Sequence, residues 1–392
     1  MYDIRKEQLK KERAYLLGVG LANQTAAQVE EHLDELALLA ETAGAVVVGR
    51  AYQMRPSPDS KFFIGSGRAD EAKKEIVALS ADLIVFDDDL SPSQIKNLEK
   101  LFEKRTLDRS MLILDIFSKH ARTHESKIQV ELAQMRYMAP RLTGLWTHLG
   151  QQTGGIGTRG PGETQLEVDK RVMKKRIAEL EKKLDAVQRQ RDQQNKRRER
   201  VFKAAIVGYT NVGKSTLLNA LSKSKVLTAD KLFATLDATT RRVYLPGFGE
   251  ALLSDTVGFI RKLPHHLVAS FRSTLGVITE ADCIVLLMDA ATAQQADQME
   301  IVNRVLNELE TERLPRLLVF NKIDCADAGG LEGLRTANPD ALFVSALSGQ
   351  GLEEFKAALR ECAIRSGCAV SAHEKWAVMA QEKSAEGGGH AS

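Results

Sequence analysis

The stretch Gly208-Tyr209-Thr210-Asn211-Val212-Gly213-Lys214-Ser215 has the spacing of a phosphate-binding loop, a Gly and four residues followed by Gly, Lys and Ser. The apolar run Ala204–Val207 comes before it, and Ser215–Leu221 has the pattern of a helix. A loop between a strand and a helix surrounds phosphates with backbone N–H groups at the positive end of the helix. We therefore expect this loop, with Thr216 beside it, to bind a nucleotide.

Two side chains of the loop have predicted roles of their own. We expect Lys214 to neutralise the β- and γ-phosphates and the Ser215 hydroxyl to bind Mg²⁺. Further along, the apolar run Leu252-Leu253-Ser254 leads into Asp255-Thr256-Val257-Gly258. Here Asp255 is predicted to hold Mg²⁺, directly or through water, and the Gly258 amide to meet a γ-phosphate.

Between these two motifs lies the segment Phe233-Ala234-Thr235-Leu236. We expect Thr235 to supply a second hydroxyl to Mg²⁺ when a γ-phosphate is present. An ordinary loop threonine is the alternative interpretation, and Thr239 and Thr240 are rival candidates in the same segment.

Asn321-Lys322-Ile323-Asp324 directly follows the apolar run Arg316–Phe320. An aspartate at this point can accept from the N1–H and the exocyclic amine of guanine, whereas adenine presents no such pair of donors. Ser345-Ala346 is then predicted to place a backbone amide at the guanine O6. The four motifs in this order predict a GTPase that binds GTP and GDP.

Phe259 follows Gly258 at the position where many switch GTPases keep a glutamine that orients the attacking water. Slow hydrolysis by the free protein is expected, with acceleration by a partner that orders the switch segments. Asn211 has two interpretations: it helps to hold a monovalent cation, K⁺, or it satisfies its own backbone. The predicted catalytic residues are Lys214, Thr235, Gly258 and Asn211.

The length of 392 residues predicts more than one domain. Before residue 122 strands and helices alternate, with strands expected at Ala14–Leu21, Ala45–Val48, Lys61–Ile64, Leu83–Phe86 and Ser110–Ile116 and helices at Thr25–Ala43, Ala69–Leu79 and Ser93–Phe102. The predicted class is therefore α/β. The expected parts are an N-terminal α/β subdomain (1–122), an antiparallel helical arm (123–200), a P-loop GTPase domain (201–364) and a short, largely disordered tail (365–392).

The predicted arm carries a seam and a concentration of positive charge. Apolar residues recur every seven positions at Leu166, Met173, Leu180 and Val187, and again at Ile177 and Leu184, as in a coiled coil. Between Lys170 and Arg200 thirteen Lys and Arg face five Asp and Glu, a local charge of +8 in a chain of +3. Such a run is either a solvated helix face or an RNA-binding surface. The residues predicted to contact RNA are Arg159, in a glycine-rich loop at the tip of the arm, and Lys196, Arg197, Arg198 and Arg200.

Composition excludes some classes of protein. No uncharged apolar run approaches the length of roughly 18 residues that a membrane span needs. The four cysteines, Cys283, Cys325, Cys362 and Cys368, include no C-x-x-C pair. We expect a soluble protein of the reducing cytoplasm.

Beyond the GTPase motifs, several stretches resemble the HflX family of ribosome-associated GTPases. They are Phe63-Ile64-Gly65-Ser66-Gly67-Arg68, Phe86-Asp87-Asp88-Asp89-Leu90-Ser91-Pro92, Val130-Glu131-Leu132-Ala133-Gln134-Met135 with Pro140-Arg141-Leu142, Gly154-Gly155-Ile156-Gly157-Thr158-Arg159-Gly160-Pro161-Gly162-Glu163, and Leu263-Pro264-His265. The resemblance covers nearly the whole chain, although its C-terminal region looks shorter than in some members.

This resemblance implies a protein that binds the large (50S) ribosomal subunit and its rRNA and releases stalled or stress-arrested ribosomes into subunits. The alternatives are a ribosome-assembly or RNA-remodelling GTPase, or a GTP-regulated factor that blocks subunit joining. The resemblance also associates an ATP-dependent activity with the N-terminal half. The Gly65-Ser66-Gly67 segment, between a predicted strand and a predicted helix, is the candidate site for this second nucleotide, ATP. A plain turn is the alternative interpretation, because no lysine or third glycine completes a fingerprint. We expect a monomer.

Overall fold

The computed structural model describes residues 11–141, 165–195, 201–222, 232–233, 235–262 and 272–368. Two compact units divide the chain. The first contains the residues up to Lys119 together with Lys127–Leu184, and the second contains His120–Ser126 and nearly all residues after Leu184. Within the described ranges, no helix is both long and apolar enough to cross a bilayer.

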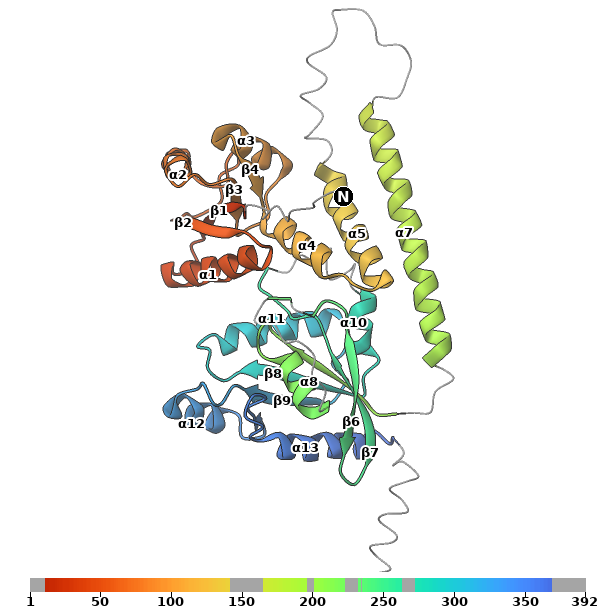
Figure 1. The fold of residues 1–392 in the computed structure, drawn as a ribbon. Coiled ribbons are helices and arrows are strands. Elements are labelled where there is room, and N and C mark those ends of the chain that lie inside the picture. Colours follow the sequence, from red (N-terminus) through yellow and green to blue (C-terminus); the bar gives the residue numbers. More distant parts are fainter. Residues whose placement is uncertain are drawn as a thin grey trace, which may run out of the picture. The chain divides into compact units, whose positions relative to one another are not determined.

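The first unit is built on a parallel sheet with the strand order β2-β1-β3-β4 (Figure 1). Its strands are β1 (Arg13–Gly20), β2 (Val46–Met54), β3 (Leu83–Phe86) and β4 (Arg105–Leu107). Among the described residues before 200, the helices are α1 (Ala26–Thr42), α2 (Ser66–Ala78), α3 (Pro92–Phe102), α4 (Arg109–His120), α5 (His124–Met138), the 3-10 helix η1 (Ala139–Arg141) and α7 (Gln165–Asn195).

Local signals explain most of these elements. β1 is buried along nearly its whole length, as expected of a parallel strand covered on both faces. α1 begins at a capping box, in which the Thr25 hydroxyl accepts from the Gln28 backbone and the Gln28 side chain accepts from the Thr25 backbone. Ser91 and Gln94 cap α3 in the same way, with Pro92 in the first turn.

Two strands predicted from the sequence are wrong. Ser110–Ile116 lies in helix α4, because the Asp108 carboxylate accepts from the Met111 backbone N–H at 2.9 Å and starts a helix where the apolar run alone suggested a strand. Lys61–Ile64 forms no strand either. The Asp59 carboxylate accepts from the backbone N–H groups of Lys61 and Phe62, and this turn replaces strand pairing.

The helical arm consists of α5 and α7, which lie side by side and run in opposite directions (Figure 1). Ile128, Leu132 and Leu180 form its buried core, and Met135, Ile177 and Leu184 pack against them. Arg136–Glu181 at 2.7 Å and Arg176–Glu131 at 2.6 Å link the two helices outside that core. Three of the six residues of the predicted seam, Ile177, Leu180 and Leu184, therefore take part in the contact between the two helices.

The second unit contains a sheet with the order β10-β9-β8-β5-β7-β6, parallel except for the β6–β7 pair. Figure 1 shows α10 and α11 on one side of this sheet and α13 on the other. Its strands are β5 (Lys203–Gly208), β6 (Thr239–Leu245), β7 (Gly249–Asp255), β8 (Cys283–Asp289), β9 (Arg316–Asn321) and β10 (Leu342–Phe343). In the part of this unit that the structure describes, the helices after residue 200 are α8 (Lys214–Ser222), α10 (Arg272–Thr279), α11 (Gln295–Glu308), α12 (Ala328–Ala337) and α13 (Leu352–Arg365).

Candidate active site

The loop Gly208–Ser215 joins strand β5 to helix α8, as the sequence predicts. A Cβ atom at Gly208 would lie 2.2 Å from the carbonyl oxygen of Leu287 on the neighbouring strand, so no larger residue fits there. Asn211 and Gly213 both have positive φ angles, 62° and 93°. This backbone turns the loop around the N-terminus of α8, where N–H groups are available to an anion.

The Lys214 side chain is buried at the start of α8. Its ammonium donates to the backbone oxygens of Tyr209 at 2.7 Å and of Gly208 at 3.3 Å. Burial lowers the pKa of Lys214 to about 8, and the nearby Asp255 carboxylate acts in the opposite direction. The ammonium is thus held inside the loop that would surround the phosphates.

Three oxygen-bearing side chains meet beside this lysine, from three separate elements. The Ser215 hydroxyl donates to an Asp255 carboxylate oxygen at 2.5 Å, and the Thr235 hydroxyl donates to the same oxygen at 3.0 Å. The two hydroxyl oxygens lie 2.9 Å apart. The register that pairs Ile206 of β5 with Asp255 of β7 brings the aspartate to this point.

The two rival threonines lie elsewhere. The Thr240 hydroxyl pairs with the Ser254 hydroxyl at 2.8 Å across β6 and β7, and the Thr239 hydroxyl bonds to the Asp237 backbone oxygen at 3.4 Å. Among the three candidates of this segment, Thr235 is the one placed beside Ser215 and Asp255.

The cluster fits a magnesium ion. Hydroxyl and carboxylate oxygens are the hard ligands that Mg²⁺ prefers, commonly with one or two carboxylates and phosphate oxygens completing its shell. The second oxygen of Asp255 is buried and has no hydrogen-bond partner in the described part of the chain, and neither has the buried Thr210 hydroxyl of the loop. Burial also raises the pKa of Asp255, against the lowering effects of Lys214 and the two hydroxyls. Buried polar atoms without partners are costly, so both atoms are suited to receive a ligand.

The segment after β7 runs along the phosphate-binding loop. The Thr210 backbone N–H donates to the Phe259 oxygen at 2.8 Å, and the Phe259 N–H donates to the Gly208 oxygen at 3.1 Å. Thr256, completely buried, donates its hydroxyl to the Ile206 oxygen at 2.8 Å. A Cβ atom at Gly258 would lie 2.8 Å from the Thr210 side chain and 3.0 Å from the Lys214 nitrogen, so Val257 and Gly258 closely adjoin the predicted phosphate site.

The predicted base-recognition residues follow β9 and β10. The Asn321 side chain donates to the Val212 oxygen of the loop at 2.8 Å and accepts from the Ala346 backbone N–H at 2.9 Å. Asp324 is mostly exposed, and the Ser345 hydroxyl lowers the pKa of its carboxyl group. The sequence predicts that Ser345-Ala346 places a backbone amide at the guanine O6, and here the Ala346 amide is bonded to Asn321. Contact with O6 would require this hydrogen bond to be shared or broken.

Some partners in this region were not predicted from the sequence. Lys322 forms an ion pair with Asp289 at the end of β8, at 2.7 Å. The Tyr209 hydroxyl accepts from the Arg261 backbone N–H at 2.7 Å and so ties the loop to the segment after Gly258. Asp289 ends strand β8, and a carboxylate at the end of an apolar run is the sequence signal that could have identified it.

Not every predicted residue is described. Phe233 is buried with a φ of 54°, and Thr216 lies half-buried in the first turn of α8. Ala234 and all five residues predicted to contact RNA, Arg159, Lys196, Arg197, Arg198 and Arg200, lie outside the described residues.

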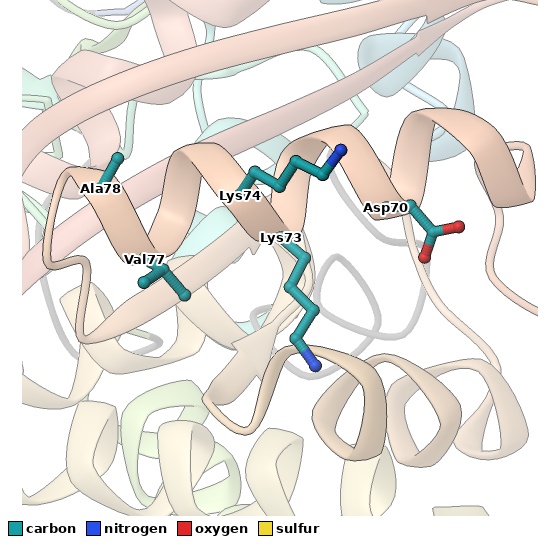
Figure 2. A pocket seen from close by; sticks show the side chains of 5 residues that line it. All are labelled: Asp70, Lys73, Lys74, Val77 and Ala78. Carbon is teal, nitrogen blue, oxygen red and sulfur yellow. The ribbon is translucent and has the colours of Figure 1, made fainter.

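The segment that raised the question of a second nucleotide lies at the start of α2. Gly65 is the N-cap residue, and its N–H donates to the Gln53 side chain at 2.8 Å. A surface hollow of about 720 Å³ lies further along this helix, and Figure 2 shows that its lining side chains all come from α2: Asp70, Lys73, Lys74, Val77 and Ala78. Within the described residues, a hollow lined by one helix offers a nucleotide no opposing wall.

The fold and the site define a P-loop GTPase: a phosphate-binding loop, a Ser–Thr–Asp oxygen cluster and a base-recognition motif meet at one edge of an α/β sheet. Family models described as the GTP-binding GTPase N-terminal region, the GTP-binding GTPase middle region and the 50S ribosome-binding GTPase match residues 30–118, 120–198 and 203–322.

The chain is 43% identical over 375 residues to the GTPase HflX of Flavobacterium psychrophilum, which covers 90% of this chain and 91% of the relative. It is 44% identical over 335 residues to the GTPase HflX of Escherichia coli, covering 84% and 79%. A solved structure of SsGBP with GDP has the same fold, with a TM-score of 0.51 at 24% identity over 90% of this chain and 99% of that one. The chain belongs to the HflX family of ribosome-associated GTPases, and it hydrolyses GTP to GDP and phosphate.

The lowered pKa of Lys214 predicts pH-dependent nucleotide binding. Phosphates stabilise the charged lysine, so binding returns its pKa towards the ordinary value and takes up a proton above pH 8. Affinity for GDP should be greatest below pH 8 and fall about tenfold between pH 7 and pH 9, as one proton becomes linked to binding. Titration calorimetry at several pH values measures this change. Lys214→Arg should bind more weakly but with a flat profile in this range, and an equally steep profile in that variant would contradict the assignment.

Proposed function

We propose that this GTPase binds the large ribosomal subunit through the basic face of its arm and, in its GTP-bound state, splits stalled ribosomes into subunits in the cytoplasm. The observation that carries the proposal is the charge on α7. Arg171, Lys174, Lys175, Lys182, Lys183 and Arg189 are all exposed, and we call them the basic face. The family description as a 50S ribosome-binding GTPase supports the choice of partner.

The position of the basic face follows from the helical repeat. Ile177, Leu180 and Leu184 turn towards α5, and residues about half a turn away point in the opposite direction. Lys175, Lys182 and Arg189 recur every seven residues there, so they form a stripe along the side of α7 away from the seam. A stripe of cations of this kind matches a series of RNA phosphates, and the binding would be salt-dependent.

Neutralising this stripe should weaken ribosome binding. The triple variant Lys175→Gln, Lys182→Gln and Arg189→Gln should lower affinity for 50S subunits about tenfold or more at moderate salt, and lower the slope of log affinity against log salt by about 2 to 3. Co-sedimentation over a salt series measures both quantities. The matched control replaces Lys73, Lys74 and Lys96 with Gln, and GTP affinity should stay unchanged in both. A basic face that is merely solvated would leave binding and slope as they were.

At the nucleotide, Ser215, Thr235 and Asp255 would hold Mg²⁺, which would neutralise phosphate charge when bound. Lys214 would balance the β- and γ-phosphates, and the Gly258 amide would donate to the γ-phosphate. Asn321 would hold the loop against the base-recognition segment while the Asp324 carboxylate accepts from the guanine N1–H and amine. These residues bind and orient the nucleotide without a covalent intermediate.

We also propose that Asn211 helps to seat K⁺ beside the phosphates, where the cation would act in place of an arginine finger. Hydrolysis should then be slower in Na⁺ than in K⁺ at equal ionic strength. Asn211→Gly keeps the positive φ angle accessible while removing the amide, so it should abolish the difference between the two salts. Equal rates for the unmodified protein in both salts would leave Asn211 with a purely backbone role.

Splitting has to be separated from two alternatives. Incubation with purified 70S ribosomes and a non-hydrolysable GTP analogue should release free subunits, as measured by gradient sedimentation. A factor that only blocks joining would leave 70S ribosomes intact yet prevent free subunits from associating. An assembly GTPase would prefer immature large subunits to mature ones.

A further inference from the structure

Asp237 lies two residues after Thr235, and its carboxylate is bonded to a distant part of the sequence. One oxygen accepts from the backbone N–H groups of Arg122 at 3.0 Å and Thr123 at 3.2 Å. The other accepts from the Thr123 hydroxyl at 2.6 Å. These residues belong to the second unit, so the contact is internal to it.

Thr123 in turn caps helix α5. Its hydroxyl oxygen accepts from the Ser126 N–H at 3.1 Å, which is the contact that starts a helix at His124. Ser126 is buried and also donates its hydroxyl to the Thr123 backbone oxygen at 3.1 Å. The group that receives three hydrogen bonds from the start of α5 is therefore the side chain of Asp237.

The contact bears directly on Thr235. A single residue, the buried Leu236, separates Thr235 from Asp237. Asp237 is fixed by charge-assisted hydrogen bonds, which are stronger than neutral ones, and β6 begins at Thr239. The backbone on one side of Thr235 is thus restrained at the position that keeps its hydroxyl 2.9 Å from the Ser215 oxygen.

We propose that Asp237 is a positioning residue for GTP hydrolysis: by binding the N-terminal cap of α5 it holds Thr235 at the Ser215–Asp255 cluster. The inference rests on the proposed role of Thr235 as a magnesium ligand. Because α5 is the first helix of the arm, the placement of Thr235 is linked to the placement of the first residues of α5. Linkage is reciprocal, so a partner that fixes the start of α5 also favours the placement of Thr235.

The test uses the free full-length protein, three single variants, the double variant of Asp237→Ala with Thr123→Val, Thr235→Ala, and one matched control. Asp237→Ala removes the acceptor, Thr123→Val removes the hydroxyl and the helix cap, and Thr123→Ser keeps both. Thr25→Val, which removes the equivalent cap of α1, is the matched control for loss of helix capping. GDP affinity, kcat and the Mg²⁺ concentration for half-maximal hydrolysis are measured, together with hydrogen exchange of residues 120–126 with a GTP analogue bound.

Asp237→Ala should lower kcat and raise the Mg²⁺ requirement about tenfold, the effect expected for losing hydrogen bonds to a charged group. Its exchange at Arg122 and Thr123 should accelerate, while GDP affinity stays within about twofold of the parent. Thr123→Val should act in the same direction and less than additively with Asp237→Ala. Thr123→Ser should restore the parent values, and Thr25→Val should change none of them.

The positioning role would be overturned if the effects of Asp237→Ala and Thr123→Val were additive. It would also be overturned if Asp237→Ala kept the Mg²⁺ requirement and the hydrogen-exchange rates of the parent protein. A Thr25→Val protein with the same loss would show a general effect of stability and would overturn it too. None of these measurements uses ribosomes, so failure of the proposed ribosome binding leaves the result unaffected. If Thr235→Ala leaves the Mg²⁺ requirement unchanged, the magnesium role of Thr235 fails instead.

Discussion

Large ribosomal subunits should raise the kcat of GTP hydrolysis at least about 10³-fold above the rate of the free protein. An arginine finger or an equivalent contribution in trans is worth 10³ to 10⁵ in related GTPases. We expect a partner to be needed because Phe259 is 1% exposed and its backbone is paired with the phosphate-binding loop. Its side chain has no polar atom to orient water at the position after Gly258.

Single-turnover hydrolysis with increasing concentrations of 50S subunits measures this activation. Small subunits serve as the control and should not accelerate the reaction. The Lys175, Lys182 and Arg189 variant should need more 50S for half-maximal activation but reach the same rate at saturation, because its nucleotide site is intact. Equal turnover with and without 50S would mean that the site is already complete and that the ribosome is not the activator.

Asp324→Asn should weaken GTP binding by about 2 to 4 kcal/mol, roughly 30- to 1000-fold, and favour xanthosine triphosphate. An amide cannot accept from both guanine donors, whereas its N–H₂ can donate to the 2-oxo group of xanthine. Asp324 is mostly exposed and contributes little to the core. The melting temperature without nucleotide should therefore change little, which separates lost recognition from lost folding.

Competition binding with the two nucleotides measures the change in preference. Asp327→Asn is the matched control, since Asp327 caps α12 three residues further on and asparagine caps a helix equally well. That variant should keep the parent affinity for GTP. Unchanged GTP affinity in Asp324→Asn would remove Asp324 from the base site.

The strongest local signals in the sequence predicted the structure well. Leu83–Phe86 forms β3 within its predicted bounds, and the Gly208–Ser215 loop joins β5 to α8. Ser110–Ile116 was wrong because an apolar run has the same composition in a buried strand and a buried helix, and the deciding signal was a single capping residue, Asp108.

Other features depend on contacts that local patterns cannot reveal. Arg109 is almost fully buried and forms ion pairs with Asp87 and Glu35, and no local pattern predicts that these three residues meet. The Asn321 bonds to Val212 and Ala346 and the Asp237 bond to Thr123 likewise join residues many positions apart. Motif spacing predicted which residues form the candidate site, but the hydrogen bonds that fix its shape became evident only in the fold.

The bracing of the loop by Asn321 also bears on how this protein could evolve. A Cβ atom at Gly213 would lie 2.3 Å from the Asn321 side-chain nitrogen, so a side chain at position 213 would displace the amide that braces the loop. Asp324, three residues away, takes no part in that brace and is open to solvent. A single replacement at Asp324 could therefore alter the base that is recognised, whereas a side chain added at position 213 would also disturb the hydrogen bond from Asn321 to the phosphate-binding loop.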